Sequence, residues 1–245
     1  MSDQKIYGLI GKSLEHSFSK KYFLKKFDNM GFNCDYLNFE LNDINEVKKV
    51  FDLPGISGVN VTIPYKEKII PYLDELSDEA IAVGAVNTIQ IKNGVKKGYN
   101  TDVYGFKQLI KPFFQSHHER SMILGTGGAA KAVAYVLESL GSEVIYISRK
   151  PKGENAFSYE EINENMIRFN GIIVNTTPLG TFPDVARFPP IPYHFIQSNQ
   201  LVIDLVYNPP LTEFLKRAAA QGATVLNGKT MLEQQAEKSW EIWNA

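Results

Sequence analysis

A glycine-rich loop at residues 125–130 constrains the fold of this chain more than any other feature. It reads Gly-Thr-Gly-Gly-Ala-Ala, follows the apolar run 122–124 and opens a segment with helical spacing. In a G-x-G-x-x-A pattern the first glycine permits a tight turn, the second lets the backbone approach a pyrophosphate, and the last small residue packs the helix against the strand. The amino end of the helix offers free N–H groups to phosphates. The pattern therefore predicts a dinucleotide site formed by Gly125, Thr126, Gly127, Gly128 and Ala129.

The apolar runs around this loop predict the architecture. After residue 120, short continuous runs at 122–124, 144–147, 172–174 and 201–205 alternate with helical stretches. Such runs are typical of strands buried on both faces of a parallel sheet, and their spacing predicts right-handed βαβ units. The expected fold class is α/β, with a Rossmann-type doubly wound parallel sheet in the C-terminal part.

The first hundred residues also alternate between strand and helix patterns, but they contain no phosphate loop. Strands are expected at 6–10, 36–39 and 58–62, and helices at 19–30 and 44–51. We assign 1–103, together with a final helical segment at 228–245, to an α/β substrate domain, and 104–227 to the nucleotide domain. The amphipathic pattern at 231–243 leaves open whether this helix covers the nucleotide sheet or returns to the first domain.

Composition excludes several classes of protein. The chain has 26 basic and 27 acidic residues, a net charge of -1, so it lacks the basic character expected of a nucleic-acid binder. No apolar run approaches the roughly 18 residues of a membrane span. The single cysteine, Cys34, excludes an intramolecular disulfide and a cysteine metal cluster, and no other metal site is expected. The polar N-terminus lacks a signal-peptide pattern, so the expected location is the cytoplasm.

The residues after the second nucleotide strand indicate the cofactor. An NAD site usually places Asp or Glu there, about 20 residues beyond the glycine loop, to bind the ribose hydroxyl. This chain has Ser148, Arg149 and Lys150 instead. A cation at that point pairs with a 2′-phosphate, and arginine can also stack on adenine. NADP is the expected cofactor, and a solvated basic loop is the alternative.

Polar motifs in both halves resemble one family. The chain contains S-x-S, N-V-T-x-P-Y-K, G-A-V-N-T, N-T-D, N-T-T-P-L-G and N-G-x-x-M in the order and spacing of the shikimate dehydrogenase family. The first motif stands at 17–19 and is preceded by His16. The others stand at 60–66, 84–88, 100–102, 175–180 and 227–231. The resemblance covers nearly the whole chain and is far more specific than any one motif.

The resemblance implies a reaction and a role for each matching residue. It implies reversible, NADP-dependent reduction of 3-dehydroshikimate to shikimate in the biosynthesis of chorismate and the aromatic amino acids. Lys66 would carry the proton of the reacting hydroxyl, and Asp102 would hold Lys66 and bind a neighbouring hydroxyl. The remaining contacts would be Ser17, Ser19 and Tyr207 near the substrate carboxylate, Thr62, Asn87 and Gln235 on ring hydroxyls, and Thr176 and Gly228 on the cofactor. The partner is thus a small molecule, and the sequence leaves monomer and homodimer both open.

Several observations qualify this resemblance. Ser17 and Ser19 are also good residues for capping a helix that begins near Lys20, where the family commonly has proline. Thr230 replaces a glycine usual in the family, and the segment 150–172 is shorter than the family norm, without a clear second arginine for the 2′-phosphate. A quinate dehydrogenase that uses NAD is therefore the nearest alternative, and a dinucleotide-binding sensor without catalysis is a more distant one.

Overall fold

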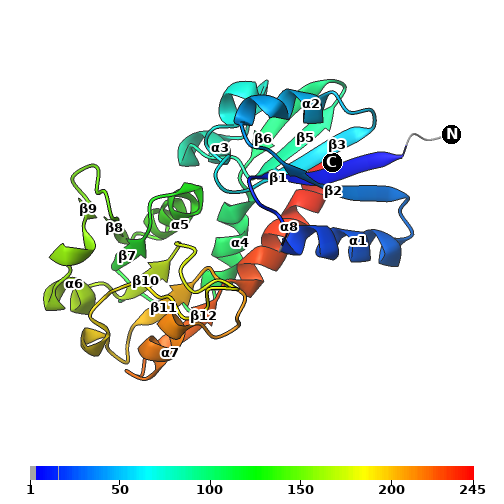
Figure 1. The fold of residues 1–245 in the computed structure, drawn as a ribbon. Coiled ribbons are helices and arrows are strands. Elements are labelled where there is room, and N and C mark those ends of the chain that lie inside the picture. The colour runs from blue at the N-terminus through cyan, green and yellow to red at the C-terminus, as the bar shows by residue number, and fades with distance from the viewer. Residues whose placement is uncertain (1–3, 16) are drawn as a thin grey trace. The chain divides into compact units, whose positions relative to one another are not determined.

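The computed structural model describes residues 4–15 and 17–245, so His16, which precedes the S-x-S motif, lies outside the described residues. The chain divides into two compact units. The first comprises residues 1–101 with 236–245, and the second comprises residues 102–235. Figure 1 shows the elements of both units coloured along the chain.

The first unit is built on a six-stranded sheet of order β2-β1-β3-β5-β6-β4. β1 is parallel to β2 and β3, whereas β5 pairs antiparallel with β3 and β6. The strands are β1 Lys5–Gly11, β2 Cys34–Glu40, β3 Ile56–Val61, β4 Glu75–Leu76, β5 Thr88–Lys92 and β6 Val95–Tyr99. The three predicted strands are confirmed. The β5–β6 hairpin was missed, although its Asn93-Gly94 turn, with positive φ at both residues, is a strong hairpin signal.

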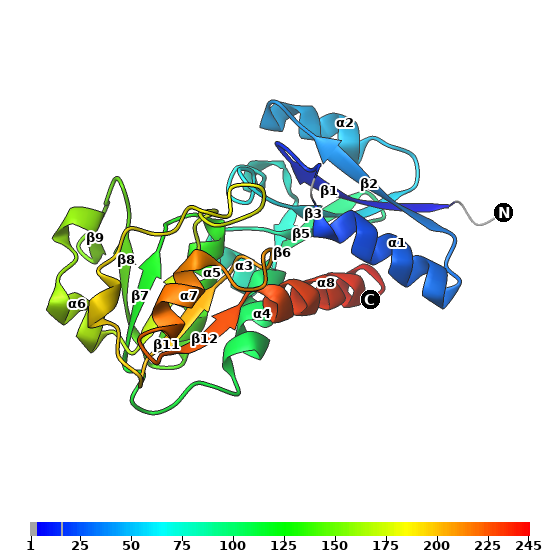
Figure 2. The same ribbon diagram turned by 60° about the horizontal axis from the view of Figure 1, so that its bottom comes forward.

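Each face of this sheet carries its own apolar cluster. On one face, Tyr7 and Leu9 pack with α1 (Phe18–Met30) and with Trp240 and Trp243 of α8 (Lys229–Trp243). On the other face, Ile10 and Val59 pack with α2 (Val47–Phe51). Figures 1 and 2 show α1 and α8 on the opposite side of β1–β3 from α2. The last helix therefore returns to the first half of the chain, which answers the question that its sequence left open.

The second unit contains an all-parallel sheet of six strands in the order β12-β11-β10-β7-β8-β9. Its strands are β7 Arg120–Leu124, β8 Glu143–Ile147, β9 Ala156–Phe157, β10 Ile172–Asn175, β11 Leu201–Asp204 and β12 Thr224–Asn227. Numbered from β7, this is the 3-2-1-4-5-6 order of a Rossmann sheet, and the order reverses between β7 and β10. The predicted fold class is confirmed.

Helices cover the parallel sheet unevenly. α5 (Gly128–Ser139) follows the glycine loop, while α6 (Glu164–Phe169) and α7 (Glu213–Ala219) pack into one cluster with β7, β10 and β11. The segment after β8 forms only β9, a short 3₁₀ turn and α6, because Pro151 and Gly153 disfavour a helix directly after the strand. The other helical elements are α3 Asp78–Val83, α4 Thr101–Ile110, η1 Ile44–Glu46, η2 Ile70–Tyr72, η3 Tyr159–Glu161 and η4 Tyr193–Phe195. In the described part of the chain, no helix has the length and apolar character needed to cross a bilayer.

Candidate functional site

Two of the predicted cofactor residues meet at the reversal point of the parallel sheet. Thr176 follows β10, and both its backbone N and its Oγ1 donate to the carbonyl of Leu124 at the end of β7, at 2.9 and 2.8 Å. Gly125 has φ +111°, and a Cβ at this position would lie 2.6 Å from Thr176 Oγ1. Both the backbone conformation and the space therefore require glycine here. The crevice at such a reversal point is where doubly wound sheets bind ligands.

The loop beyond Gly125 is open to a ligand. Gly127 is the N-cap of α5, and among the described residues no atom lies within 4 Å of the place where its Cβ would be. Thr126 and Gly127 are exposed, whereas Ala130 is buried against the sheet. The first turn of α5, residues 128–131, contains Lys131 and no acidic side chain, so its positive end is not offset by a carboxylate. A pyrophosphate fits this cradle.

The predicted 2′-phosphate residues lie at the carboxyl end of β8. Ser148 N donates to the carbonyl of Phe157 at 2.9 Å, which holds the start of the turn, and Lys150 N donates to Ser148 Oγ at 3.2 Å. The side chains of Arg149 and Lys150 are exposed. Burial raises the pKa of Tyr159, and the positive charge of Arg149 works against this rise, so the guanidinium lies near that phenol. The cationic side chains of Arg149 and Lys150 thus lie exposed at the end of β8, the strand next to the one that leads into the glycine loop.

Backbone hydrogen bonds bring three predicted residues of the first unit together. The carbonyl of Lys66 accepts from Val86 N at 2.8 Å, and the carbonyl of Asn87 accepts from Val61 N at 2.8 Å. Thr62 N donates to the carbonyl of Ile10 at 2.8 Å, at the carboxyl end of β1. Thr62, Lys66 and Asn87 thus lie on adjoining segments at one edge of the sheet. Lys66 is half-buried.

A buried polar network supports this edge, and two of its members, Tyr36 and Ser239, lie outside the sequence motifs. Asn60 accepts from Tyr36 Oη at 2.8 Å and donates to Thr88 Oγ1 at 3.1 Å and to Ser239 Oγ at 3.0 Å. Asn87 joins the same network, because its Oδ1 accepts from Thr101 N at 2.7 Å. Ser239 could have been found from its place four residues after Gln235, on the same face of a helix.

The S-x-S motif begins α1. Ser17 is the N-cap, and its Oγ accepts from Ser19 N at 3.3 Å. The capping function considered for this motif is thus confirmed for Ser17. Ser19 is 8% exposed and forms a hydrogen bond with Tyr36, which opposes the rise that burial causes in the pKa of that phenol. The contact of both serines with a substrate carboxylate stays a prediction.

Asp102 and Gln235 come from two helices that cross within the second unit. Asp102 is buried in the first turn of α4, and Gly105 lies one turn later on the same face. A Cβ on Gly105 would lie 2.5 Å from the carbonyl of Met231 and 3.2 Å from Gln235 Cβ. The crossing therefore brings the segment of Gln235 alongside that of Asp102, whereas Lys66 belongs to the first unit.

Tyr207 and Gly228 lie on loops that follow β11 and β12. Gly228 N donates to the carbonyl of Val206 at 3.2 Å, which joins the two loops directly before Tyr207. Tyr207 is half-buried, and this burial raises the pKa of its phenol.

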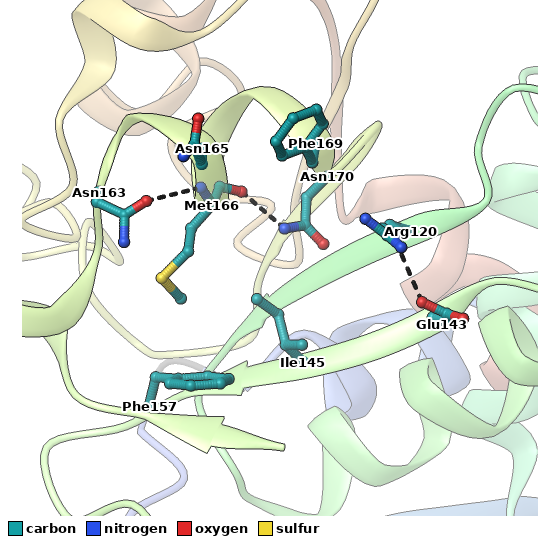
Figure 3. Close-up of a pocket in the computed structure, with 9 residues that line it drawn as sticks. All are labelled: Arg120, Glu143, Ile145, Phe157, Asn163, Asn165, Met166, Phe169 and Asn170. Atoms are coloured by element: carbon teal, nitrogen blue, oxygen red, sulfur yellow. Dashed lines mark hydrogen bonds and ion pairs between the residues drawn. The ribbon is translucent and has the colours of Figure 1, made fainter. Parts of the chain in front are cut away.

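A cavity of about 450 Å³ lies along β8, between that strand and α6 (Figure 3). Arg120 and Glu143, the first residues of β7 and β8, form an ion pair of 3.2 Å at its rim. Ile145 and Phe157 line it opposite Met166 of α6. None of the residues that line it is a predicted cofactor or substrate residue. Among residues 4–15 and 17–245, no three histidine, cysteine, aspartate or glutamate side chains are grouped as metal ligands.

Comparisons with known proteins agree with this organisation. A family profile described as "Shikimate dehydrogenase substrate binding domain" matches residues 9–89. A protein of Clostridium beijerinckii named "Shikimate dehydrogenase (NADP(+))" is 41% identical over 249 residues, covering 97% of this chain and 91% of that protein. The crystal structure of shikimate dehydrogenase 1 from Peptoclostridium difficile superimposes with a TM-score of 0.87 at 38% identity, covering 98% of this chain and 92% of that one.

A second solved structure, shikimate 5-dehydrogenase of Thermus thermophilus in complex with NADP(H) and shikimate, has a TM-score of 0.84 at 30% identity. The superposition covers 98% of this chain and 93% of the Thermus thermophilus chain. The relatives are therefore matched along almost their full length, in both units. This chain belongs to the shikimate dehydrogenase family.

Proposed function

We infer that this protein is an NADP-dependent shikimate dehydrogenase, which catalyses the reversible reduction of 3-dehydroshikimate to shikimate in chorismate biosynthesis. The observation that carries this function is the near full-length match to NADP-dependent shikimate dehydrogenases. The reversal point of the Rossmann sheet, where Gly125 meets Thr176, supports it with a place for the dinucleotide.

We propose that the two halves divide the work. In this proposal, residues 1–103 with 228–245 form the substrate-binding catalytic domain, and 104–227 form the NADP-binding domain. The polar edge formed by Thr62, Lys66 and Asn87 supports the first assignment. The open amino end of α5 supports the second.

In the proposed chemistry, a side chain of the protein transfers the proton and the cofactor transfers the hydride. When bound, NADP accepts or supplies the hydride. Lys66 Nζ takes the proton of the reacting hydroxyl on oxidation and returns it on reduction, which is general acid–base catalysis. Nζ must be the neutral amine when it takes the proton and becomes the ammonium group by doing so; Asp102 orients the Lys66 side chain and accepts a hydrogen bond from a neighbouring hydroxyl. No metal is assigned a step.

The other proposed contacts hold the substrate in one orientation. Ser17 and Ser19 donate hydroxyl hydrogen bonds to its carboxylate, near Tyr207. Thr62, Asn87 and Gln235 hold the ring hydroxyls. The two serines favour shikimate over quinate, because the additional hydroxyl of quinate would need room beside the carboxylate.

A spectrophotometric assay of dinucleotide reduction tests the function. The purified protein is given shikimate or quinate, each with NADP⁺ or NAD⁺. We expect the highest kcat/KM for shikimate with NADP⁺. A higher kcat/KM for quinate would reject the substrate assignment, and NADP⁺ binding without turnover of either acid would instead indicate a sensor.

We propose the cytoplasm as the place where this enzyme works. Its one cysteine, Cys34, means that no internal disulfide requires an oxidising compartment. Cell fractionation tests this, since the assay above should find the activity with cytoplasmic marker enzymes rather than in the membrane or secreted fractions.

A further inference from the structure

A buried carboxylate connects two neighbouring strands at the edge where the nucleotide is proposed to bind. Asn175 and Asp204 are the last residues of β10 and β11, and they are register partners in the parallel sheet. Both side chains are fully buried. Asn175 Nδ2 donates to Asp204 Oδ1 at 2.9 Å. The ends of the two strands are thus joined through side chains as well as through the backbone.

Each of these residues also holds the loop that follows its strand. Asn175 Oδ1 accepts from Thr177 N at 3.0 Å and from Thr177 Oγ1 at 2.7 Å. Asp204 Oδ1 accepts from Val206 N at 3.0 Å, and Asp204 Oδ2 accepts from Thr212 Oγ1 at 2.6 Å. Thr212 is the N-cap of α7, so the carboxylate fixes both ends of the segment between β11 and that helix.

The loops held in this way carry three residues of the proposed site. Thr176 lies between Asn175 and Thr177, Tyr207 directly follows Val206, and Gly228 N donates to the carbonyl of Val206. We propose that Asp204 is a positioning residue, which holds the loops of Thr176, Tyr207 and Gly228 in the arrangement that binds NADP and shikimate. It acts through these loops and not by touching either ligand. This inference rests on the proposed function.

The requirement for a carboxylate follows from the donors around it. Three groups donate to its two oxygens: the amide of Asn175, the backbone N of Val206 and the hydroxyl of Thr212. An ionised carboxylate only accepts, so it satisfies all three, whereas an amide carries two donors of its own. An asparagine at 204 would direct an N–H group at the hydroxyl of Thr212 or at Val206 N. One of the loop contacts would then be lost or rearranged.

The opposite end of β11 offers a matched control. Gln200, directly before the strand, is 2% exposed and donates to the carbonyls of Ile167 and Asn170 at 2.6 and 2.7 Å. Its Oε1 accepts from Gln197 N at 2.6 Å. It is therefore nearly as buried as Asp204 and makes the same number of side-chain hydrogen bonds, but it holds segments at the opposite end of β11 from the glycine loop.

The experiment compares Asp204→Asn with Gln200→Met in the full-length protein. Thermal unfolding, the Kd for NADP⁺ by fluorescence titration, and kcat and KM for shikimate are measured for each. We expect both variants to lower the Tm, but only Asp204→Asn to raise the Kd for NADP⁺ and the KM for shikimate, by about tenfold. Equal ligand constants in the two variants would overturn the positioning function.

A second pair of variants decides the matter if Asp204→Asn does not fold. Thr212→Val removes the hydroxyl that donates to Asp204 at nearly constant volume, and Thr212→Ser retains it. We expect the serine variant to bind NADP⁺ like the wild type and the valine variant to bind it more weakly. Equal Kd values for the two would overturn the proposal. Inactivity of the wild type towards shikimate would reject the proposed function instead, while these NADP⁺ binding measurements would still test the loop arrangement.

Discussion

The indole of Trp243 lies directly against Gly58 of β3, and its Nε1 donates a hydrogen bond to the carbonyl of Ile89 at 2.9 Å. The last turn of α8 therefore contacts the backbone of two neighbouring strands. Tyr7 stacks on the same indole with ring centroids 4.8 Å apart. The sheet of the first unit thus has a glycine, Gly58, at the point where the indole of Trp243 packs against it.

The first prediction concerns this contact. A Cβ at Gly58 would collide with the indole, so Gly58→Ala should lower the free energy of unfolding by about 1–3 kcal/mol, the usual cost of overpacking a core. Urea denaturation measures it. In a Trp243→Ala background the added methyl group has room, so the cost should be smaller by more than about 0.5 kcal/mol. Equal costs in the two backgrounds would show that the contact is not responsible.

The second prediction separates two glycines of the nucleotide loop. Gly125→Ala places a Cβ on a backbone with positive φ and in close contact with Thr176, so it should lower the Tm as well as weaken NADP⁺ binding. Gly127→Ala meets no described atom in the ligand-free protein, so its Tm should stay at the wild-type value. Its Kd for NADP⁺ should nevertheless rise by about tenfold or more, or roughly 1.4 kcal/mol, because the methyl group blocks the pyrophosphate. Unchanged binding by Gly127→Ala would argue against a pyrophosphate at this loop.

The third prediction concerns the proposed proton carrier. Lys66→Ala should lower kcat by roughly 10²–10⁴-fold and leave the Kd for NADP⁺ unchanged, since a positioned acid–base group contributes about that much. Lys68→Ala is the control, because Lys68 lies two residues further on and is exposed. Steady-state kinetics with shikimate measure both. A change confined to KM would make Lys66 a binding residue.

The fourth prediction concerns the choice of cofactor. Arg149→Ala should raise the KM for NADP⁺ by about tenfold or more, the effect of losing a charge-assisted hydrogen bond, with little change in the KM for NAD⁺. Arg168→Ala removes an exposed arginine of the same unit that pairs with Glu164, and should change neither constant. If Arg149→Ala changes both constants equally, the 2′-phosphate is bound elsewhere, with Lys150 the next residue to test.

The fifth prediction concerns pH. Burial raises the pKa of Asp204 from 3.8 to about 6, and hydrogen bonds from Thr212, Val206 and Asn175 oppose the rise. The phenol of Tyr193 lies near Asp204, and burial raises the pKa of that phenol, so it is neutral below pH 6 and adds no charge. At pH values between these two pKa values, Asp204 is protonated in the folded chain and ionised in the unfolded chain. The contribution of Asp204 to stability is therefore full below about pH 4 and is lost as the pH rises through about 6.

The measurement compares urea unfolding of the wild type and Asp204→Asn from about pH 4 to pH 7. The wild type should lose on the order of 3 kcal/mol relative to the variant across this range, because one pKa unit corresponds to about 1.36 kcal/mol. Groups common to both proteins cancel in the difference. A difference that does not vary with pH would mean that Asp204 is ionised in the folded state throughout.

The sequence predicted those parts of the fold that local patterns determine. The strands of the parallel sheet were evident because they are buried on both faces and therefore read as continuous apolar runs. β5 and β6 were missed because Lys92, Lys96 and Lys97 interrupt their apolar pattern, and β12 was missed because Thr224–Asn227 is a short strand at the edge of the sheet. Only the Asn93-Gly94 turn signalled the hairpin.

The candidate site was predicted less completely than the fold. The glycine loop was evident because each of its residues has a local geometric requirement. Asp204 carries no such signal, since its importance depends on Asn175, Thr212 and Val206, which its strand position and a later helix bring to it. Asn60 begins the motif at 60–66, but its partners Tyr36 and Ser239 are distant in sequence and belong to no motif. Contacts of this kind follow from the fold, and a motif search does not reveal them.

The return of α8 to the first unit has a consequence for how the chain is made. Trp240 and Trp243 fill the aromatic cluster around Tyr7, Phe23 and Phe27, yet the ribosome adds them after the whole second unit has been translated. The face of β1 that they cover is therefore exposed throughout synthesis of the parallel sheet. An exposed apolar face in a nascent chain is a binding target for chaperones and a source of aggregation. For this protein, completion of the unit translated first depends on a helix that is translated after the second unit.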